Sequence, residues 1–467
     1  MGTTRREFAQ LATAVGAAVA GAKTASAQSK GEGKGDGAFR PNIVYVHSHD
    51  SGRYLRPYGH DVPTPNLLRL AKQGVLFRQV HCASPGCSPS RAALLTGQAA
   101  HSSGMLGLAH LGWSLHDYRQ HMLHTLRPHG YHSVLAGLQH IAKDPHVIGY
   151  DEILPHRTEH ASDVAPGAAR YLLNKPKQPF FLDVGFFETH RDFPDPVDNP
   201  DYIMPPAPIP DTSRTRLDMA GFHASARLMD RGVGMVLDAL EKAGLADNTL
   251  VLSTTDHGIA FPDMKCNLLD GGTAVSMIMR GPGVFAKPGV CDALISHIDV
   301  FPTLCEYLAI ERPAWLQGQS FLPILRGETA QINDAVYGEV TYHAAYQPMR
   351  SVRTERWKYI RRYDGRTAPN LPNCDDGGSK AYWVKQGWRE QPVAPEELYD
   401  LVFDPNETNN LIAAERTRQV VADMRGRLDA WMKRTNDPLL QGPVPLPANG
   451  RAVDPNALSP ESLKGTI

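Results

Sequence analysis

The chain has 467 residues, of which 42% are hydrophobic and 21% charged, and its formal net charge is −1. Such a length exceeds one minimal domain, and the composition is ordinary for a globular protein. The balanced charge excludes a global field that would draw the chain to nucleic acid or to an anionic membrane, so an anionic ligand must be attracted locally.

The first 27 residues have the layout of a twin-arginine (Tat) signal peptide. Arg5 and Arg6 precede a weakly apolar run, residues 11–22, and residues 25–27 read Ala-Ser-Ala, which suits cleavage before Gln28. A frayed N-terminal helix is the competing interpretation. No later run approaches the ~20 apolar residues that span a bilayer. We expect export by the Tat machinery, a periplasmic or secreted location and no membrane anchor.

Residues 28–40, rich in Gly, Lys and Ser, predict a flexible linker. Beyond them, short apolar runs typical of buried parallel strands alternate with segments typical of helices. The expected strands are residues 43–46, 75–77, 180–186 and 249–253, and the expected helices are residues 67–73, 91–95 and 224–243. This alternation predicts an α/β domain, residues 41–345, with a large, mainly parallel sheet sandwiched by helices.

The pattern changes near Tyr337. Residues 350–353 and 357–360 indicate short antiparallel strands, and a final helix is expected over about residues 414–433. We therefore predict a smaller C-terminal α+β domain, residues 346–442, that contains an antiparallel sheet. The Pro- and Ala-rich tail, residues 443–467, is expected to be extended.

Six cysteines are spread over the chain without any C-x-x-C pair, which argues against a zinc ribbon or a thioredoxin motif. Six in so long a chain do not make a disulfide scaffold. The formation of one or two disulfides after export is an open alternative. Taken alone, each cysteine is expected to be a buried apolar thiol.

Ionisable residues gather directly after three of the expected strands. His49 and Asp50 follow the first strand, His190 follows the middle one, and Asp256 and His257 follow the late one. Ligands of open α/β sheets bind beyond the carboxyl ends of the strands. Each residue alone would be read as a loop cap, but together these carboxylates and imidazoles have the composition of a metal site.

The segment 87–97, CSPSRAALLTG, places Cys87 just before an expected helix. Backbone N–H groups at that position favour developing negative charge, and Arg91, four residues on, lies on the same helix face. The segment closely resembles the signature of the sulfatase family, in which this cysteine is oxidised to formylglycine and hydrates to a geminal diol. A structural cysteine before a capped helix is the alternative.

The resemblance extends over nearly the whole chain after the leader. The matching segments include residues 41–44 (PNIV), 64–66 (TPN), 253–256 (STTD) and 397–400 (ELYD). Residues 256–262 (DHGIAFP) and 348–353 (PMRSVR) look most like the heparan N-sulfatase, or sulfamidase, group. The resemblance implies an alkaline-phosphatase-like fold, a sulfuric ester hydrolase and a maturase that generates the formylglycine.

By the same resemblance, Asp50, Asp256 and the modified Cys87 hold one divalent metal, usually calcium, with Mg²⁺, Mn²⁺ or Zn²⁺ as alternatives. Two positions depart from the common family pattern, because His49 stands for an aspartate and His257 for an asparagine. Calcium prefers oxygen ligands, whereas imidazole suits transition metals. The identity of the metal therefore stays open, and both histidines are candidate ligands.

The remaining matched positions are Arg91, His140, His190 and Lys265. The resemblance implies that Arg91 steadies the formylglycine, that His190 and Lys265 contact the sulfate, and that His140 stands near the diol. The lysine that usually precedes this histidine by two positions is Leu138 here. A positive charge is therefore lost or comes from elsewhere, for which Lys143 is a candidate.

These roles predict hydrolysis of a sulfate ester or a sulfamate. A diol oxygen attacks sulfur in line, His190 protonates the leaving group, and His140 takes the proton whose loss expels sulfate. The sulfamidase resemblance points to a sulfated sugar, the terminal N-sulfoglucosamine of heparan-type glycans. Glu339, His343 and Arg350 lie near the predicted domain junction and are candidate sugar contacts, with structural roles equally open.

Two other functions are compatible with the sequence. A phosphonate monoester or phosphodiester hydrolase shares the fold and the metal, and a parallel panel of phosphorus and sulfate esters separates the two activities. A non-catalytic protein that binds sulfated glycans is suggested by Leu138. Binding without sulfate release by a protein that carries formylglycine would support this second alternative.

Overall fold

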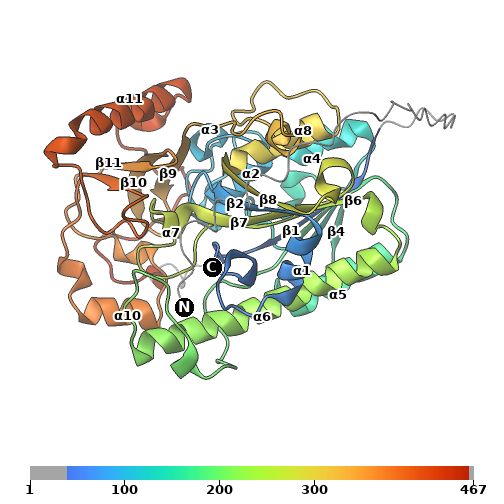
Figure 1. Cartoon of the computed structure of the whole chain (residues 1–467), viewed down its shortest axis with the longest axis horizontal. Coiled ribbons are helices and arrows are strands. Elements are labelled where there is room, and N and C mark those ends of the chain that lie inside the picture. Colours follow the sequence, from blue (N-terminus) through green and yellow to red (C-terminus); the bar gives the residue numbers. More distant parts are fainter. Residues whose placement is uncertain (1–38, 462–467) are drawn as a thin grey trace, which may run out of the picture. The chain divides into compact units, whose positions relative to one another are not determined.

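The computed structural model of the chain describes residues 39–461. The predicted signal peptide, residues 1–27, and nearly all of the predicted linker lie outside the described residues. Within the described part, the strands form an eight-stranded mixed sheet and a four-stranded antiparallel sheet (Figure 1). The predicted α/β class, with a large sheet and a smaller antiparallel one in the C-terminal region, is confirmed.

The large sheet is mainly parallel. Across the sheet the strands are β4 (Glu152–Leu154), β3 (His132–Gly137), β5 (Phe180–Gly185), β1 (Asn42–Ser48), β6 (Thr249–Thr255), β7 (Ala274–Arg280), β2 (Val75–His81) and β8 (Gly289–Ser296). Only β7 runs antiparallel to its described neighbours, β6 and β2. Consequently β1, β5 and β6 end at the same edge of the sheet.

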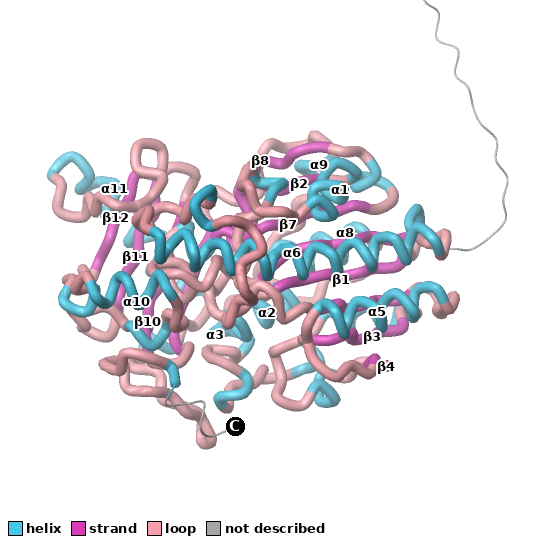
Figure 2. Tube along the Cα trace, turned by 90° about the horizontal axis from the view of Figure 1, so that it is seen from below, coloured by secondary structure: helices cyan, strands magenta, loops and turns pink. Residues whose placement is uncertain are grey.

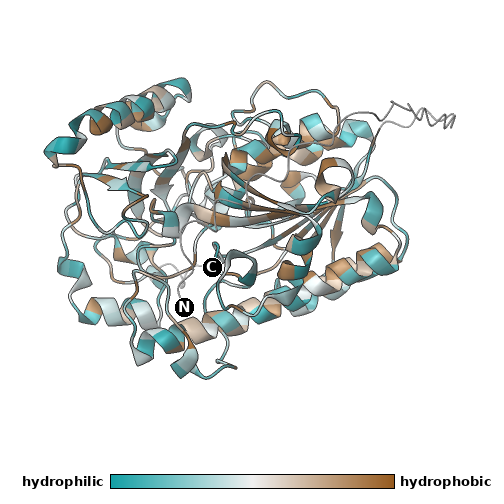
Figure 3. Cartoon of the chain, viewed as in Figure 1, coloured by the Kyte–Doolittle hydropathy of each residue, from teal (hydrophilic) through white to brown (hydrophobic). Residues whose placement is uncertain are grey.

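Helices cover both faces of the large sheet (Figures 1 and 2). Since successive side chains of a strand point to opposite faces, Val44 packs on one side and Tyr45 on the other. The Val44 face is covered by α1 (Pro65–Gln73), α5 (Ala161–Leu173) and α6 (Ser213–Lys242), and the Tyr45 face by α2 (Cys87–Thr96), α4 (Met122–Leu126) and α8 (Val300–Tyr307). The apolar strands between polar-faced helices explain the brown interior of Figure 3.

Helix α6 begins well before residue 224, where the sequence pattern places its start. Thr212 and Thr215 form a reciprocal capping box, each side chain accepting from the other's backbone N–H. These bonds satisfy N–H groups that the first helical turn leaves without partners, so the helix starts at Ser213.

The antiparallel sheet has the order β12 (Glu396–Asp400), β11 (Trp357–Arg362), β10 (Tyr346–Arg353) and β9 (Val336–Tyr342). The other described α-helices are α3 (Ala100–Ser103), α7 (Asp270–Thr273), α9 (Leu322–Leu325), α10 (Gly378–Lys385) and α11 (Arg418–Arg434). The sheet includes the two predicted antiparallel strands, but β9 precedes residue 345. The domain boundary at that residue stays a prediction.

The described part of the tail packs on the preceding residues. The backbone of Val453 forms a parallel bridge with Ala345, and the Tyr342 hydroxyl donates to the carbonyl of Val444 at 2.8 Å. All six cysteines lie in the described part and are buried, and none is paired with another. No helix within residues 39–461 has both the length and the apolar character needed to cross a bilayer.

A buried ion network joins the antiparallel sheet to the rest of the fold. Arg350 on β10 donates to both oxygens of Asp437 at 2.5 and 3.0 Å and to the carbonyl of Val340 at 2.8 Å. Glu339 on β9 lies 3.5 Å from the same guanidinium and accepts from the ring of His101 in α3 at 3.0 Å. Arg350 is the cation that both carboxylates share, and each carboxylate also accepts one backbone N–H.

We expect Arg350→Met to lower the free energy of unfolding by roughly 3–5 kcal/mol, because two buried carboxylates then lose their counter-charge. Urea denaturation followed by circular dichroism measures the change. The control is Arg356→Met, which removes an exposed arginine paired with Asp400 and should lower stability by no more than about 1 kcal/mol. Equal stability of the two variants would contradict this account of the network.

Candidate active site

Two carboxylates meet at the ends of β1 and β6. The strands are parallel neighbours with Ser48 paired to Thr255, so the residues that follow them emerge side by side. The backbone N–H of Asp50 donates to Asp256 Oδ1 at 2.9 Å, and both side chains are buried. The chain turns sharply here, since Asp50 has a φ of 37°.

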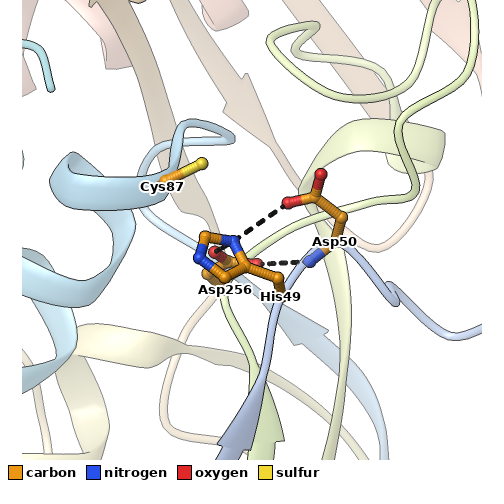
Figure 4. Close-up of side chains that lie close together, drawn as sticks. All are labelled: His49, Asp50, Cys87 and Asp256. Carbon is orange, nitrogen blue, oxygen red and sulfur yellow. Dashed lines mark hydrogen bonds and ion pairs between the residues drawn. The ribbon is translucent and has the colours of Figure 1, made fainter. Parts of the chain in front are cut away.

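Cys87 is the first residue of α2, directly after the N-cap residue Gly86. Its Sγ lies 3.4 Å from His257 Nε2 and 3.9 Å from His343 Nε2. Burial raises the pKa of the thiol, but Lys265 and His257 oppose this effect and hold the pKa well below its ordinary value. The position therefore favours negative charge. Figure 4 shows the side chains that converge with it, His49, Asp50 and Asp256.

Arg91 lies one turn into α2 and fixes the second carboxylate. Its guanidinium donates to Asp256 Oδ2 at 2.9 Å and to the carbonyl of Ser48 at 3.0 Å, and it also contacts His47 Nδ1. The other ring nitrogen of His47 lies 2.8 Å from Asp183 Oδ1. The planar fork of arginine suits this set of partners, which orients Arg91 without any ligand.

Both unexpected histidines direct a ring nitrogen at the carboxylates. His49 Nδ1 is 3.1 Å from Asp256 Oδ2 and 3.3 Å from Asp50 Oδ1, and His257 Nε2 is 3.3 Å from that Asp50 oxygen. His257 Nδ1 donates to the carbonyl of Gly258 at 3.0 Å, so Nε2 is the nitrogen left for the site. Burial alone would lower the pKa of each ring, but the carboxylates outweigh it. The net pKa of both histidines is therefore raised, to about 9 for His257.

The donor set fits a divalent metal ion. One atom each from His49, Asp50, Cys87 and Asp256 lies within 4.8 Å of the others, and all four residues are buried. Arg91 pairs with Asp256, and Lys265 is shared between Asp50 and a third carboxylate. When no metal ion is bound, protons on the imidazoles have to balance the negative charge that remains. A metal ion would do the same while using the imidazole nitrogens as ligands, a mixed nitrogen and oxygen set that transition metals accept better than calcium does.

Lys265 stands between this group and a third carboxylate. Its Nζ donates to Asp50 Oδ2 at 2.8 Å, to Asp375 Oδ2 at 2.7 Å and to His190 Nε2 at 3.3 Å. His190 Nδ1 donates to the carbonyl of Arg191 at 2.5 Å, so its Nε2 faces the lysine. Burial and the lysine lower the His190 pKa. Sequence reasoning missed Asp375, which stands in no motif and comes from beyond β11.

His140 approaches the site together with a histidine that the sequence did not single out. His140 Nε2 lies 3.0 Å from His110 Nδ1, and the two rings stack with an interplanar angle of 8°. Burial lowers the pKa of His140 to about 4, with the Cys87 thiol opposing. Leu138 is buried and Lys143 is exposed, so Lys143 does not replace the missing charge inside the site.

The three predicted sugar contacts separate. Glu339 and Arg350 belong to the buried ion network, where their charges are already matched, so the structure favours the structural role left open for them over contact with a sugar. Both side chains lie near the domain junction, but they are packed inside it, where a sugar does not reach them. His343 alone reaches the cluster, through its contact with Cys87.

The chain is similar to known sulfatases over most of its length. The family model "Sulfatase" matches residues 41–310, and the model "N-sulphoglucosamine sulphohydrolase, C-terminal" matches residues 263–375. The human N-sulphoglucosamine sulphohydrolase is 29% identical, covering 86% of this chain and 92% of that protein. An ulvan-active sulfatase of Formosa agariphila is 28% identical, covering 92% and 89% respectively.

A solved structure in complex with its substrate D-glucosamine-2-N,6-O-disulfate superposes with a TM-score of 0.68. It is 18% identical and covers 86% of this chain and 99% of that chain. At this identity the likeness supports the fold alone, and it agrees with the alkaline-phosphatase-like architecture expected from the sequence.

We expect metal-free protein to bind one divalent ion and Asp256→Asn to weaken that binding by at least about tenfold. Affinity should rise with pH, because His257, with a pKa of about 9, must release its proton to the solvent before a cation can take its place. Calorimetric titration with Ca²⁺, Mn²⁺ and Zn²⁺ tests both points.

Asp299→Asn is the matched control for this titration, since Asp299 is an equally buried carboxyl held by backbone N–H groups away from the cluster. Its metal affinity should equal that of the unchanged protein. The same loss of affinity in both variants would mean that the effect is structural.

Proposed function

The chain belongs to the sulfatase family, and we propose on that premise that it hydrolyses a sulfate ester or sulfamate of a sulfated sugar, using formylglycine made from Cys87. The observation that carries the proposal is the position of Cys87. It begins α2, four residues before Arg91, and it faces Asp50, Asp256 and Lys265. A nucleophile and the cations for an anionic substrate are thus in one buried cluster.

The sugar is proposed from the relatives. One is named N-sulphoglucosamine sulphohydrolase, and a protein of the same fold was solved with a glucosamine N,O-disulfate as its substrate. The match of residues 263–375 to the C-terminal model of the first group supports N-sulfoglucosamine for this chain as well. We propose a terminal sugar of a heparan-type glycan.

The position of each residue indicates its role in the proposed reaction. A divalent metal held by Asp50 and Asp256, with His49 and His257 as further ligands, would withdraw charge from the sulfate and from the nucleophile. Arg91 keeps Asp256 in place, and its bonds to backbone and side chain mean that no reorganisation is needed during reaction.

Proton transfers fall to Lys265, His190 and His140. Burial lowers the pKa of Lys265, but its two carboxylate partners outweigh this effect and hold the pKa well above its ordinary value. Its Nζ contacts His190 Nε2, so this pair can place a proton beside the leaving atom. His140 has a neutral ring near Cys87 and can accept the proton that the hydrated aldehyde must lose before sulfate departs. His110, stacked on His140, connects that ring to the exposed surface.

We also propose a route of export and maturation for this protein. The twin-arginine leader would export a folded protein to the periplasm or beyond, so a formylglycine-generating maturase could act on Cys87 in the cytoplasm. Mass spectrometry of the tryptic peptide that spans residues 79–91 shows whether residue 87 has lost its sulfur after co-expression with a maturase.

The function is tested by sulfate release from N-sulfoglucosamine, from O-sulfated glucosamines and from a matched set of phosphorus esters, with and without chelator. We expect release from a sulfated sugar that chelator abolishes and that Cys87→Ala lowers to background. Cys305→Ala is the control, because it removes a buried thiol far from the strand ends. A preference for phosphorus esters would overturn the proposal.

The pH profile tests the role of His140. A base must be unprotonated, and the pKa of His140 is about 4, below the value of about 6.5 for an ordinary histidine. At a saturating concentration of the metal ion, we expect kcat to stay level from about pH 7 to about pH 5 and to fall as the pH drops through about 4. An acid limb near the ordinary histidine value would assign the base to another group.

A further inference from the structure

Asp375 puts a third carboxylate into a pocket proposed to bind an anion. Its Oδ2 accepts from Lys265 Nζ at 2.7 Å, and its carboxylate, Asp50 and His190 each offer an atom within 4.8 Å of the others. The side chain is 16% exposed, so it can meet a ligand. A carboxylate beside a sulfate repels it, and the pocket therefore needs this group for something other than binding the sulfate oxygens.

The loop that carries Asp375 is built to hold it there. The side chain of Asn373 accepts from the N–H of Ala345 at 2.7 Å and donates to Gln347 at 2.7 Å. Lys380 Nζ donates to the carbonyl of Cys374 at 2.6 Å. These buried bonds fix the two residues that directly precede the carboxylate.

The other end of the loop is equally fixed. The chain at Gly377 passes so close to Arg191 that a Cβ there would lie 2.1 Å from the guanidinium Nη1. Arg191 in turn forms two bonds with Asp218 of α6, at 2.7 and 2.8 Å. The position of Asp375 is thus set by the fold and not by its single ion pair.

The cluster has two groups that share Asp50. One contains Cys87 and the candidate metal ligands, and the other contains His190 and Asp375. In a displacement at sulfur with in-line geometry, the attacking and leaving atoms lie on opposite sides of the sulfur. With residue 87 as the source of the attacking oxygen, the leaving atom belongs on the side of the second group.

The leaving atom distinguishes two classes of substrate. In a sulfamate it is a nitrogen that carries one hydrogen, which can donate to a carboxylate. In an O-sulfate it is an oxygen that has only lone pairs, which face a carboxylate unfavourably. An unpaired polar group in such a site rejects the analogue that lacks its partner.

We propose that Asp375 selects sulfamates over O-sulfates by accepting a hydrogen bond from the bridging N–H. In the step that it serves, an oxygen at residue 87 bonds to sulfur and the S–N bond breaks. The nitrogen keeps the electron pair of that bond and gains one proton through His190, while the attacking oxygen loses one. The product amine has two N–H groups, one of which still faces Asp375. This inference rests on the proposed function.

The test compares N-sulfoglucosamine with glucose 2-sulfate, which differs from it by an oxygen in place of the bridging N–H. The variant is Asp375→Asn, whose amide oxygen can still accept from Lys265 while its NH₂ turns an acceptor into a donor. Asp376→Asn is the control. Asp376 is the next carboxylate along the chain, and it accepts from Lys380 outside the cluster.

The unchanged enzyme should prefer the sulfamate in kcat/KM. Asp375→Asn should lower kcat/KM for the sulfamate by roughly tenfold or more, and leave that for the O-sulfate equal or higher. Asp376→Asn should keep the original preference. An equal loss for both substrates, or a preference for the O-sulfate in the unchanged enzyme, would overturn the role of Asp375 and leave the sulfatase activity standing.

Binding provides a second readout that does not depend on turnover. Calorimetry with Cys87→Ser protein, alone and combined with Asp375→Asn, measures the affinity ratio of the same two compounds. Loss of the sulfamate preference on adding Asp375→Asn supports the proposal, and an unchanged ratio contradicts it. Absence of sulfate release by the unchanged enzyme from any sulfated sugar would instead refute the proposed function.

Discussion

The packing of Asp50 against Asp256 governs the rest of the site. The two carboxylates follow neighbouring parallel strands and are linked by a backbone hydrogen bond of 2.9 Å, so the fold itself brings like charges together. Burial of two such groups is tolerated only when cations and hydrogen bonds compensate. Arg91 from α2 and Lys265 from the loop after β6 each contact one of the two carboxylates. Because Lys265 is shared with Asp375, one negative charge remains, and it favours the binding of a metal ion.

This constraint also explains why the C-terminal region is part of the site. Lys265 carries one charge but has two carboxylate partners, and the second, Asp375, comes from the segment between β11 and α10. His343, directly after β9, contacts Cys87. The nucleophile therefore lies between the two sheets, and the buried network around Arg350 has a functional consequence because it fixes where β9 and β10 lie relative to Cys87.

The sequence predicts those parts of the site that are set by local pattern. His49, Asp50, Asp256 and His257 stand directly after apolar strand runs, and parallel strands that end at one edge must bring such residues together. The helix that starts at Cys87 follows from its signature in the same way. The register between distant segments has no such local sign, which is why Asp375 and His110 were missed.

Glu339 and Arg350 show the same limit from the other side. Glu339 and Arg350 are charged residues near a domain junction, and charge near a junction suggests a ligand. Whether such a charge faces solvent or a buried partner depends on Asp437, which is far along the chain. Likewise Thr212 extends α6 through a capping interaction that apolar periodicity does not record.

The three departures from the common family pattern are best understood together through charge. Replacing an aspartate with His49 removes one negative charge from the cluster when the ring is neutral, and replacing a lysine with Leu138 removes one positive charge. Once a metal ion has displaced its proton, the ring of His257, which stands for an asparagine, is neutral and changes no formal charge. The net charge of the site is therefore conserved, while two imidazole nitrogens now point at Asp50 and Asp256. A site that kept both the aspartate and Leu138 would hold one more buried negative charge than this one, so the changes at His49 and Leu138 offset each other in charge.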